Sequence, residues 1–180
     1  MEKRVTMQIK SKFKNLCIRG IDTKNCKVIK RTLSVAMKKY YAPEKLHLEF
    51  SGKMNKTMIE MLLDYKEKIT SLDIYVNANK DMLFMQHPTS LECLSLSGHI
   101  CAADTMVNVC EAMLAKYANN LINLKVSHLR KNLRVPNLPK LKSLTLDCID
   151  EKAAWNILEH CRPTITRLHV NGTDMDSRPN

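Results

Sequence analysis

The stretch Leu91-Glu-Cys-Leu-Ser-Leu96 decides the fold, because its spacing of apolar residues recurs along the chain. It recurs as Leu121-Ile-Asn-Leu-Lys-Val126 and as Leu141-Lys-Ser-Leu-Thr-Leu146. In each copy, apolar residues alternate with polar ones at the end of the hexad, which is the pattern of a strand buried on one face. One such hexad is weak evidence, whereas a series of copies predicts a repeat architecture.

Seven copies are present. Those at Phe13, Ile69 and Ile165 are complete, whereas Leu46-His-Leu48 has Pro43 where the first apolar residue is expected. The spacings between the central leucines are 30, 26, 22, 30, 20 and 24 residues, close to those of leucine-rich repeats. These leucines are Leu16, Leu46, Leu72, Leu94, Leu124, Leu144 and Leu168.

The segments between the hexads predict helices. Apolar stripes of helical period occur in residues 23–41, 55–69, 102–119 and 151–161. Asp104 and Asp150 are candidate N-caps, and Pro163 is expected beyond the end of the last helix. Connectors 77–90 and 128–140, which contain asparagines and prolines, predict short turns or irregular loops.

Strand and helix in alternation predict an α/β fold. We expect a right-handed βα leucine-rich-repeat solenoid of about seven repeats, with a curved parallel sheet on the concave face and helices on the convex face. Residues 13–172 form the predicted repeat domain. Residues 1–12 are expected to be a basic cap or strand, with Val5, Met7 and Ile9 alternating, and residues 173–180 a C-terminal tail.

Three stretches carry a family resemblance: Ser90–Gly98, Asn120–Ser127 and Pro139–Asp147 resemble the strand motif of the leucine-rich-repeat superfamily, ribonuclease-inhibitor-like type. The irregular repeat lengths most resemble the repeat region of F-box/leucine-rich-repeat proteins. That resemblance implies an adaptor that captures substrates for a cullin-type ubiquitin ligase. The residues before Phe13 are too few for an F-box, so we expect a repeat-only relative or part of a longer protein.

Strand residues that flank the inner pair are expected on the concave face, in three columns that run across the sheet. Together they form a polar and nearly neutral surface, which suits recognition of a protein rather than of phosphates. We predict partner binding there, with Tyr75, Arg167 and His169 as anchors. The full predicted set is Arg19, His47, Asp73, Tyr75, Lys125, Asp147, Arg167 and His169. The alternative is that these are ordinary solvated strand residues.

The net charge of +11 comes almost entirely from one end, since residues 1–45 hold 13 Lys and Arg against three acidic residues. Five of these cations are expected on one side of the helix in residues 24–41. Three readings are open for this patch: a solvated face, a site for an acidic protein, or a nucleic-acid site. The patch comprises Lys24, Lys27, Lys30, Arg31 and Lys38.

Catalytic and metal-binding motifs are not found in the sequence, which has no C-x-x-C pair, no H-E-x-x-H and no glycine-rich phosphate loop. We therefore expect a non-enzymatic protein without a cofactor or a metal. Seven scattered cysteines and the absence of a secretory signal favour the cytoplasm or nucleus, and no segment predicts a membrane span. Cys93, Cys110, Cys148 and Cys161 are expected to be small buried apolar residues.

The last hexad, Ile165–Val170, is followed by too few residues for a covering helix. Solenoids usually cover such an open end. We therefore expect a partner contact or missing repeats at this C-terminal edge.

Overall fold

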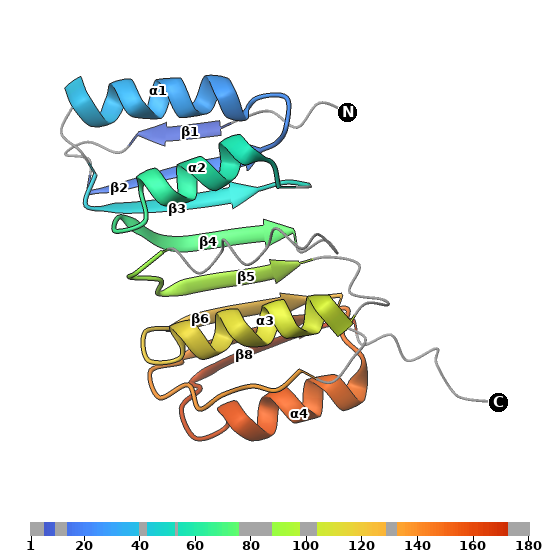
Figure 1. Cartoon of the computed structure of the whole chain (residues 1–180). Helices are drawn as coiled ribbons and strands as arrows, with labels where there is room; N and C mark the ends of the chain where they lie inside the picture. The colour runs from blue at the N-terminus through green and yellow to red at the C-terminus, as the bar shows by residue number, and fades with distance from the viewer. Residues whose placement is uncertain are drawn as a thin grey trace. The chain divides into compact units, whose positions relative to one another are not determined.

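The computed structural model contains both strands and helices, and each described helix lies between two strands in the sequence, which confirms the α/β class (Figure 1). The structure describes residues 6–9, 14–39, 43–52, 54–75, 88–97, 104–128 and 133–172. They fall into two compact units, of which unit 1 contains the described residues up to Leu91 and unit 2 those from Glu92 onward. Within the described ranges, no helix is long and apolar enough to cross a membrane.

The sheet of unit 1 runs in the order β1 (Thr6–Ile9), β2 (Asn15–Ile21), β3 (Lys45–Phe50) and β4 (Ile69–Tyr75). β1 is antiparallel to β2, whereas β2, β3 and β4 are parallel. β1 lies in the segment for which a cap or strand was predicted. Parallel neighbours require a crossover, and the helices between the strands supply it.

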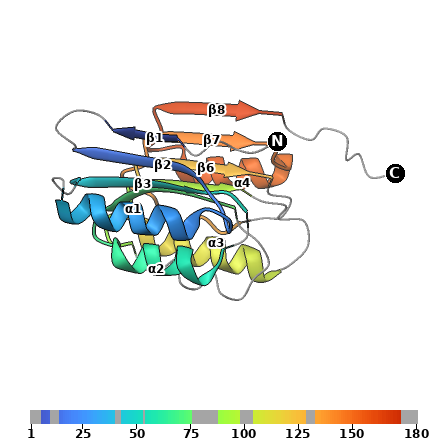
Figure 2. The same ribbon diagram turned by 90° about the horizontal axis from the view of Figure 1, so that it is seen from above.

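The helices of unit 1 are α1 (Cys26–Lys39) and α2 (Lys56–Asp64), each shorter than its predicted range. The Asn55 side chain accepts a hydrogen bond from the backbone N–H of Met58 at 3.0 Å, which satisfies one of the free donors where α2 begins. Figure 2 shows both helices on the same side of the unit 1 strands. The other side of this sheet is left free of described helices.

Unit 2 contains β5 (Cys93–Ser97), β6 (Asn123–Ser127), β7 (Ser143–Asp147) and β8 (Arg167–Asn171), all parallel and in this order. Their register pairs the four central leucines, as the hexads predict. The paired leucines are Leu94, Leu124, Leu144 and Leu168.

The helices of unit 2 are α3 (Asp104–Tyr117) and α4 (Glu151–Cys161). α4 has its predicted bounds, and the Asp150 carboxylate caps it by accepting from the backbone N–H groups of Lys152 and Ala153 at 3.0 and 3.2 Å. α3 begins at Asp104, but the role predicted for that side chain falls outside the described residues. Pro163 follows α4, as expected.

The core of each unit is aliphatic, since the inner strand residues pack against apolar helix residues. In unit 1, Leu48 and Leu72 of the strands and Met58 of α2 are buried, and in unit 2, Leu144 of β7 and Ile157 of α4 are buried. This burial follows from the hexad alternation, which directs every second strand residue toward the helices.

A left-handed backbone conformation follows each of the last three strands. His128 has φ +58°, Cys148 φ +50° and Gly172 φ +44°. The strand residues before them, Ser127, Asp147 and Asn171, are register partners. The backbone N–H of His128 donates to the carbonyl of Asp147, and that of Cys148 to the carbonyl of Asn171, each at 2.9 Å. The same turn therefore recurs from strand to strand.

The register of β3 with β4 differs from the prediction. Leu46 pairs with Ile69, but His47 pairs with Ser71 and Leu48 with Leu72, because β4 has one extra residue at this point. The prediction aligned Leu46 with Leu72, which is wrong by three residues at Leu46 and by two from His47 onward. All three apolar residues of β3 are buried, so the hexad pattern permits two registers there, and Pro43 removes the apolar residue that would distinguish them.

Several predictions fall partly or wholly outside the described residues. These are the tail 173–180, Val5, most of the connector 77–90, and residues 129–132 of the connector 128–140. The described part of the second connector, residues 133–140, is irregular apart from a turn, as its prolines predict.

Candidate protein-binding surface

Each sheet has a face that its helices do not cover, formed by the strand residues between the buried ones. We call it the open face. In unit 2 the register arranges these residues in rows, as predicted. The first row is Cys93, Asn123, Ser143 and Arg167, the second is Ser95, Lys125, Thr145 and His169, and the third contains Asp147 and Asn171.

Polar contacts connect neighbouring strands on the open face of unit 2. The Lys125 ammonium lies 3.8 Å from the Asp147 carboxylate, and the Asn123 amide donates to the Cys93 sulfur at 3.1 Å. Arg167 and His169 are exposed on β8. In the described part of unit 2 the open face is therefore polar and mixed in charge, and its side chains on β8 are exposed to solvent.

Ser127 departs from the prediction that its column is exposed. It is buried, and its hydroxyl has no hydrogen-bond partner among the described residues. Ser127 immediately precedes the left-handed residue His128, where β6 ends. The end of the strand therefore encloses a side chain that simple alternation would expose.

In unit 1 the corrected register changes which residues meet on the open face. Cys17, His47 and Ser71 form one row, and Glu49 and Asp73 belong to the next. The predicted alignment of Leu46 with Leu72 would place His47 beside Asp73, and this pairing is therefore wrong. The extra residue in β4 moves Asp73 opposite Glu49 instead.

His47 lies at the centre of the unit 1 face. Its Nδ1 forms a hydrogen bond with the Ser71 hydroxyl. Burial lowers the pKa of His47, the positive charge of Arg19 lowers it further, and the nearby Glu49 carboxylate opposes the shift. Arg19 and Glu49 themselves lie 3.8 Å apart. The neutral ring is thus the favoured form in the folded chain.

All eight residues predicted to bind a partner occupy open-face positions on strands. The structure brings two of them together, Lys125 and Asp147, and places a third, Arg19, close to Glu49. Tyr75 is half-buried at the end of β4. Glu49 and Ser71 were not selected from the sequence, although Glu49 occupies the predicted column beside Arg19 and could have been chosen on that ground.

The predicted basic patch on α1 divides in the structure. Lys24, Lys27, Arg31 and Lys38 are exposed. Lys30 instead points to α2, where its ammonium lies 2.7 Å from Glu60 and 3.2 Å from Asp64. The hydrogen bond with Glu60 raises the pKa of Lys30 and lowers that of Glu60. The charge of Lys30 is therefore neutralised within the chain.

The cysteines differ in their surroundings. Cys110 and Cys161 are buried, as expected, and burial raises the pKa of their thiols to about 12 and about 11. Cys93 is half-buried and Cys148 is exposed, so the prediction of burial is wrong for Cys148, which lies in the left-handed turn after β7. No group of His, Cys, Asp and Glu in the described ranges is arranged to hold a metal ion.

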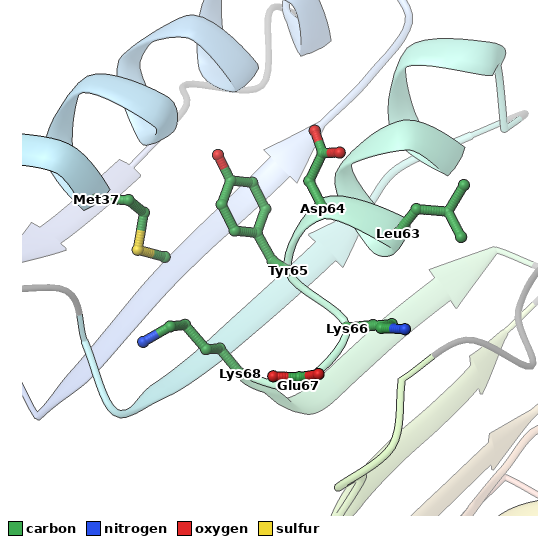
Figure 3. Close-up of a pocket in the computed structure, with 7 residues that line it drawn as sticks. All are labelled: Met37, Leu63, Asp64, Tyr65, Lys66, Glu67 and Lys68. Atoms are coloured by element: carbon green, nitrogen blue, oxygen red, sulfur yellow. The ribbon is translucent and has the colours of Figure 1, made fainter.

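A hollow of about 350 Å³ lies beside the C-terminal end of α2, close to Met37 of α1 (Figure 3). In that view Lys66 and Lys68 point to opposite sides. Two polar residues that line the hollow contact other parts of unit 1: Asp64 pairs with Lys30, and Lys68 donates to the carbonyl of Pro43 at 3.1 Å. These contacts join α2 to α1 and the segment after α2 to the segment before β3, which is a structural role.

Comparison with known proteins adds no relative: no family model, no curated protein and no solved structure matches the chain.

Proposed function

We propose that the chain is a βα repeat protein of the leucine-rich-repeat type. The recurrence of the hexads supports this, as does the left-handed turn that follows three successive strands in register. In such an array each unit buries its apolar side only against its neighbours. Within each unit, every strand then contributes a few polar side chains to the open face.

We further propose that this protein recognises another protein through the open face and catalyses no reaction. The observation that carries the proposal is the set of register rows in unit 2. Each row contains polar residues on neighbouring strands, and two rows end on β8 at the exposed Arg167 and His169. Arginine is enriched among residues that dominate binding energy. Opposite charges such as Lys125 and Asp147 give a face that discriminates between partners by charge pattern.

A role as a substrate-binding adaptor in ubiquitin ligation, acting in the cytoplasm or nucleus, is the more specific form of this proposal. It rests on the resemblance of the hexads to the repeats of F-box/leucine-rich-repeat proteins. An adaptor subunit of a ubiquitin ligase among the bound proteins would support it.

The test is affinity purification of the tagged chain from nuclease-treated cell extract, followed by measurement of binding to each recovered protein. We expect the Arg167→Ser/His169→Ser variant to lose affinity by about 2 kcal/mol, roughly thirty-fold, because truncated anchors leave their partner groups unpaired. The matched control is His160→Ser/Arg162→Ser, which removes an exposed histidine and arginine at the end of α4.

Equal binding by both variants would contradict the use of the open face of β8. Loss of every bound protein after nuclease treatment would instead favour nucleic acid as the ligand, since protein recovery would then depend on it.

A further inference from the structure

The outward side of α1 combines exposed apolar residues with cations. Val28 is 66% exposed and Val35 50% exposed, although both are β-branched apolar residues in a regular helix. At 3.6 residues per turn, they lie with Lys27, Arg31 and Lys38 in an arc of roughly 100°. The exposed Lys24 lies in the turn just before α1. The buried Ile29 and Leu33 lie on the opposite side of the helix. We call this set the outer stripe: Lys24, Lys27, Val28, Arg31, Val35 and Lys38.

The charge of the outer stripe is not compensated by the described residues. No ion pair joins Lys24, Lys27, Arg31 or Lys38 to an acidic side chain in the described ranges. The nearest acidic residues of α2, Glu60 and Asp64, are occupied by Lys30. The stripe therefore presents four positive charges, and a ligand with negative charges gains from all of them.

The two exposed valines favour a ligand that has apolar residues as well as negative charge. They are seven residues apart, which places them two helical turns and about 10 Å apart along α1. That spacing matches the apolar residues on one side of a second helix packed along α1. Phosphates gain nothing from such residues, and membrane-binding helices usually add large aromatic or leucine side chains to a basic face.

A shallow hollow lies next to this stripe, between α1 and α2. Its volume is about 460 Å³, and it is open to solvent at Val28. It is lined by residues of both helices, among which Lys30 and Glu60 form an ion pair. The lining residues are Lys27, Val28, Lys30, Arg31 and Ser34 of α1, and Thr57 and Glu60 of α2. An apolar side chain that enters it meets Val28, while an acidic neighbour reaches Lys27 or Arg31.

We propose that the outer stripe of α1 binds an acidic amphipathic helix of a partner protein. Apolar residues of that helix contact Val28 and Val35, and its carboxylates pair with Lys27, Arg31 and Lys38. The site is separate from the open face of the strands, because the outer stripe lies on the side of α1 that is turned away from the core. Its test is therefore independent of the test of the open face.

The experiment measures binding of the full chain to labelled probes by fluorescence anisotropy. The main probe is a synthetic helical peptide about four turns long, with leucines on one side and glutamates elsewhere. A scrambled peptide of equal composition tests the amphipathic arrangement. Single-stranded DNA and phosphatidylserine vesicles test the other anionic ligands.

We expect the amphipathic peptide to bind at least roughly tenfold more tightly than the scrambled one. Val28→Ser/Val35→Ser and Lys27→Gln/Arg31→Gln/Lys38→Gln should each weaken this binding by a similar factor or more. The matched control is Lys140→Gln/Lys142→Gln/Lys152→Gln, which removes three exposed cations of unit 2 and should leave binding unchanged. Arg167→Ser/His169→Ser should also leave it unchanged.

Three results would overturn the proposal: equal binding of the amphipathic and scrambled peptides, unchanged binding by the valine variant, or binding of DNA or vesicles without binding of the peptide. All the substituted side chains are exposed, and valine and serine have similar helix propensity, so a folding defect is not expected. Circular dichroism of each variant checks this.

Discussion

β7 and β8 carry the same alternation of residues, yet the structure buries only one of them. Leu144 and Leu146 of β7 are 0% and 1% exposed, whereas their register partners on β8, Leu168 and Val170, are 49% and 46% exposed. β7 has a strand on each side, while β8 has a described neighbour only at β7. The hexad therefore determines which residues of a strand face the core, whereas a following repeat determines whether those residues are buried.

β8 is therefore the place where association is expected. Its apolar pair is half-exposed, and an unpaired strand edge presents free backbone donors and acceptors. The contact predicted at this C-terminal edge stays a prediction, and the first variants below test it together with the comparison.

The largest effect is expected from truncating the buried leucine of β7. Leu144→Ala should reduce the free energy of unfolding by about 2–5 kcal/mol, because it removes buried contacts and leaves a cavity. Leu168→Ala at the register partner should cost about 1 kcal/mol or less, because half of that side chain is already in water. Urea denaturation followed by circular dichroism measures both.

Equal losses for Leu144→Ala and Leu168→Ala would contradict the difference in burial between β7 and β8, since they would show that Leu168 is covered in solution. Repeating the measurement at several protein concentrations identifies the reason. If association covers β8, the cost of Leu168→Ala will grow with concentration, because stability then includes the contact between molecules.

The sequence predicts the parts of the fold in which several local signals agree. α4 has its predicted bounds because Asp150 caps it and Pro163 follows it, and the rows of unit 2 follow from complete hexads. The β3–β4 register was missed because three alternating apolar residues in β3 fit two alignments. The pairing of Lys30 with Glu60 was also missed, since it depends on how α1 and α2 pack. Exposure of Val28 likewise follows from packing, which spacing alone does not determine.

A smaller effect is expected at the turns after the same two strands. Cys148 adopts φ +50°, a conformation that costs an L-residue about 1–2 kcal/mol relative to glycine, and the equivalent Gly172 adopts φ +44°. Cys148→Gly should therefore stabilise the chain by up to about 1 kcal/mol, and Gly172→Ala should destabilise it by about 1 kcal/mol. Thermal unfolding and urea denaturation measure both shifts.

Cys148→Ala is the control for loss of the thiol, because it keeps a Cβ in the left-handed conformation. Among the described residues, a Cβ at Gly172 would meet the Cys148 sulfur alone, at an ordinary 3.9 Å, so the expected cost of Gly172→Ala is conformational rather than steric. If Cys148→Gly and Cys148→Ala change stability equally, the backbone conformation is not the cause.

The smallest effect is expected in the pH dependence of stability, where an interior strand of an open face differs from an edge strand. His47 lies on β3 between two strands and is half-buried, whereas His169 on β8 is exposed. Burial and Arg19 lower the pKa of His47 in the folded chain, so on acidification the unfolded chain takes up this proton first. Stability should therefore fall as the pH drops below the ordinary histidine value of about 6.5, and level off below the folded pKa.

His47→Gln should remove this part of the pH dependence, while Asn15→Gln on the neighbouring β2 should retain it. Urea midpoints measured from about pH 7.5 to 5 test the difference. The effect is modest because the ring is partly in water, where solvent screens the charge of Arg19. If the urea midpoint of His47→Gln changes with pH in parallel with that of the unchanged chain, the interior position does not restrict protonation of the ring. The contrast between interior and edge strands would then apply to apolar side chains alone.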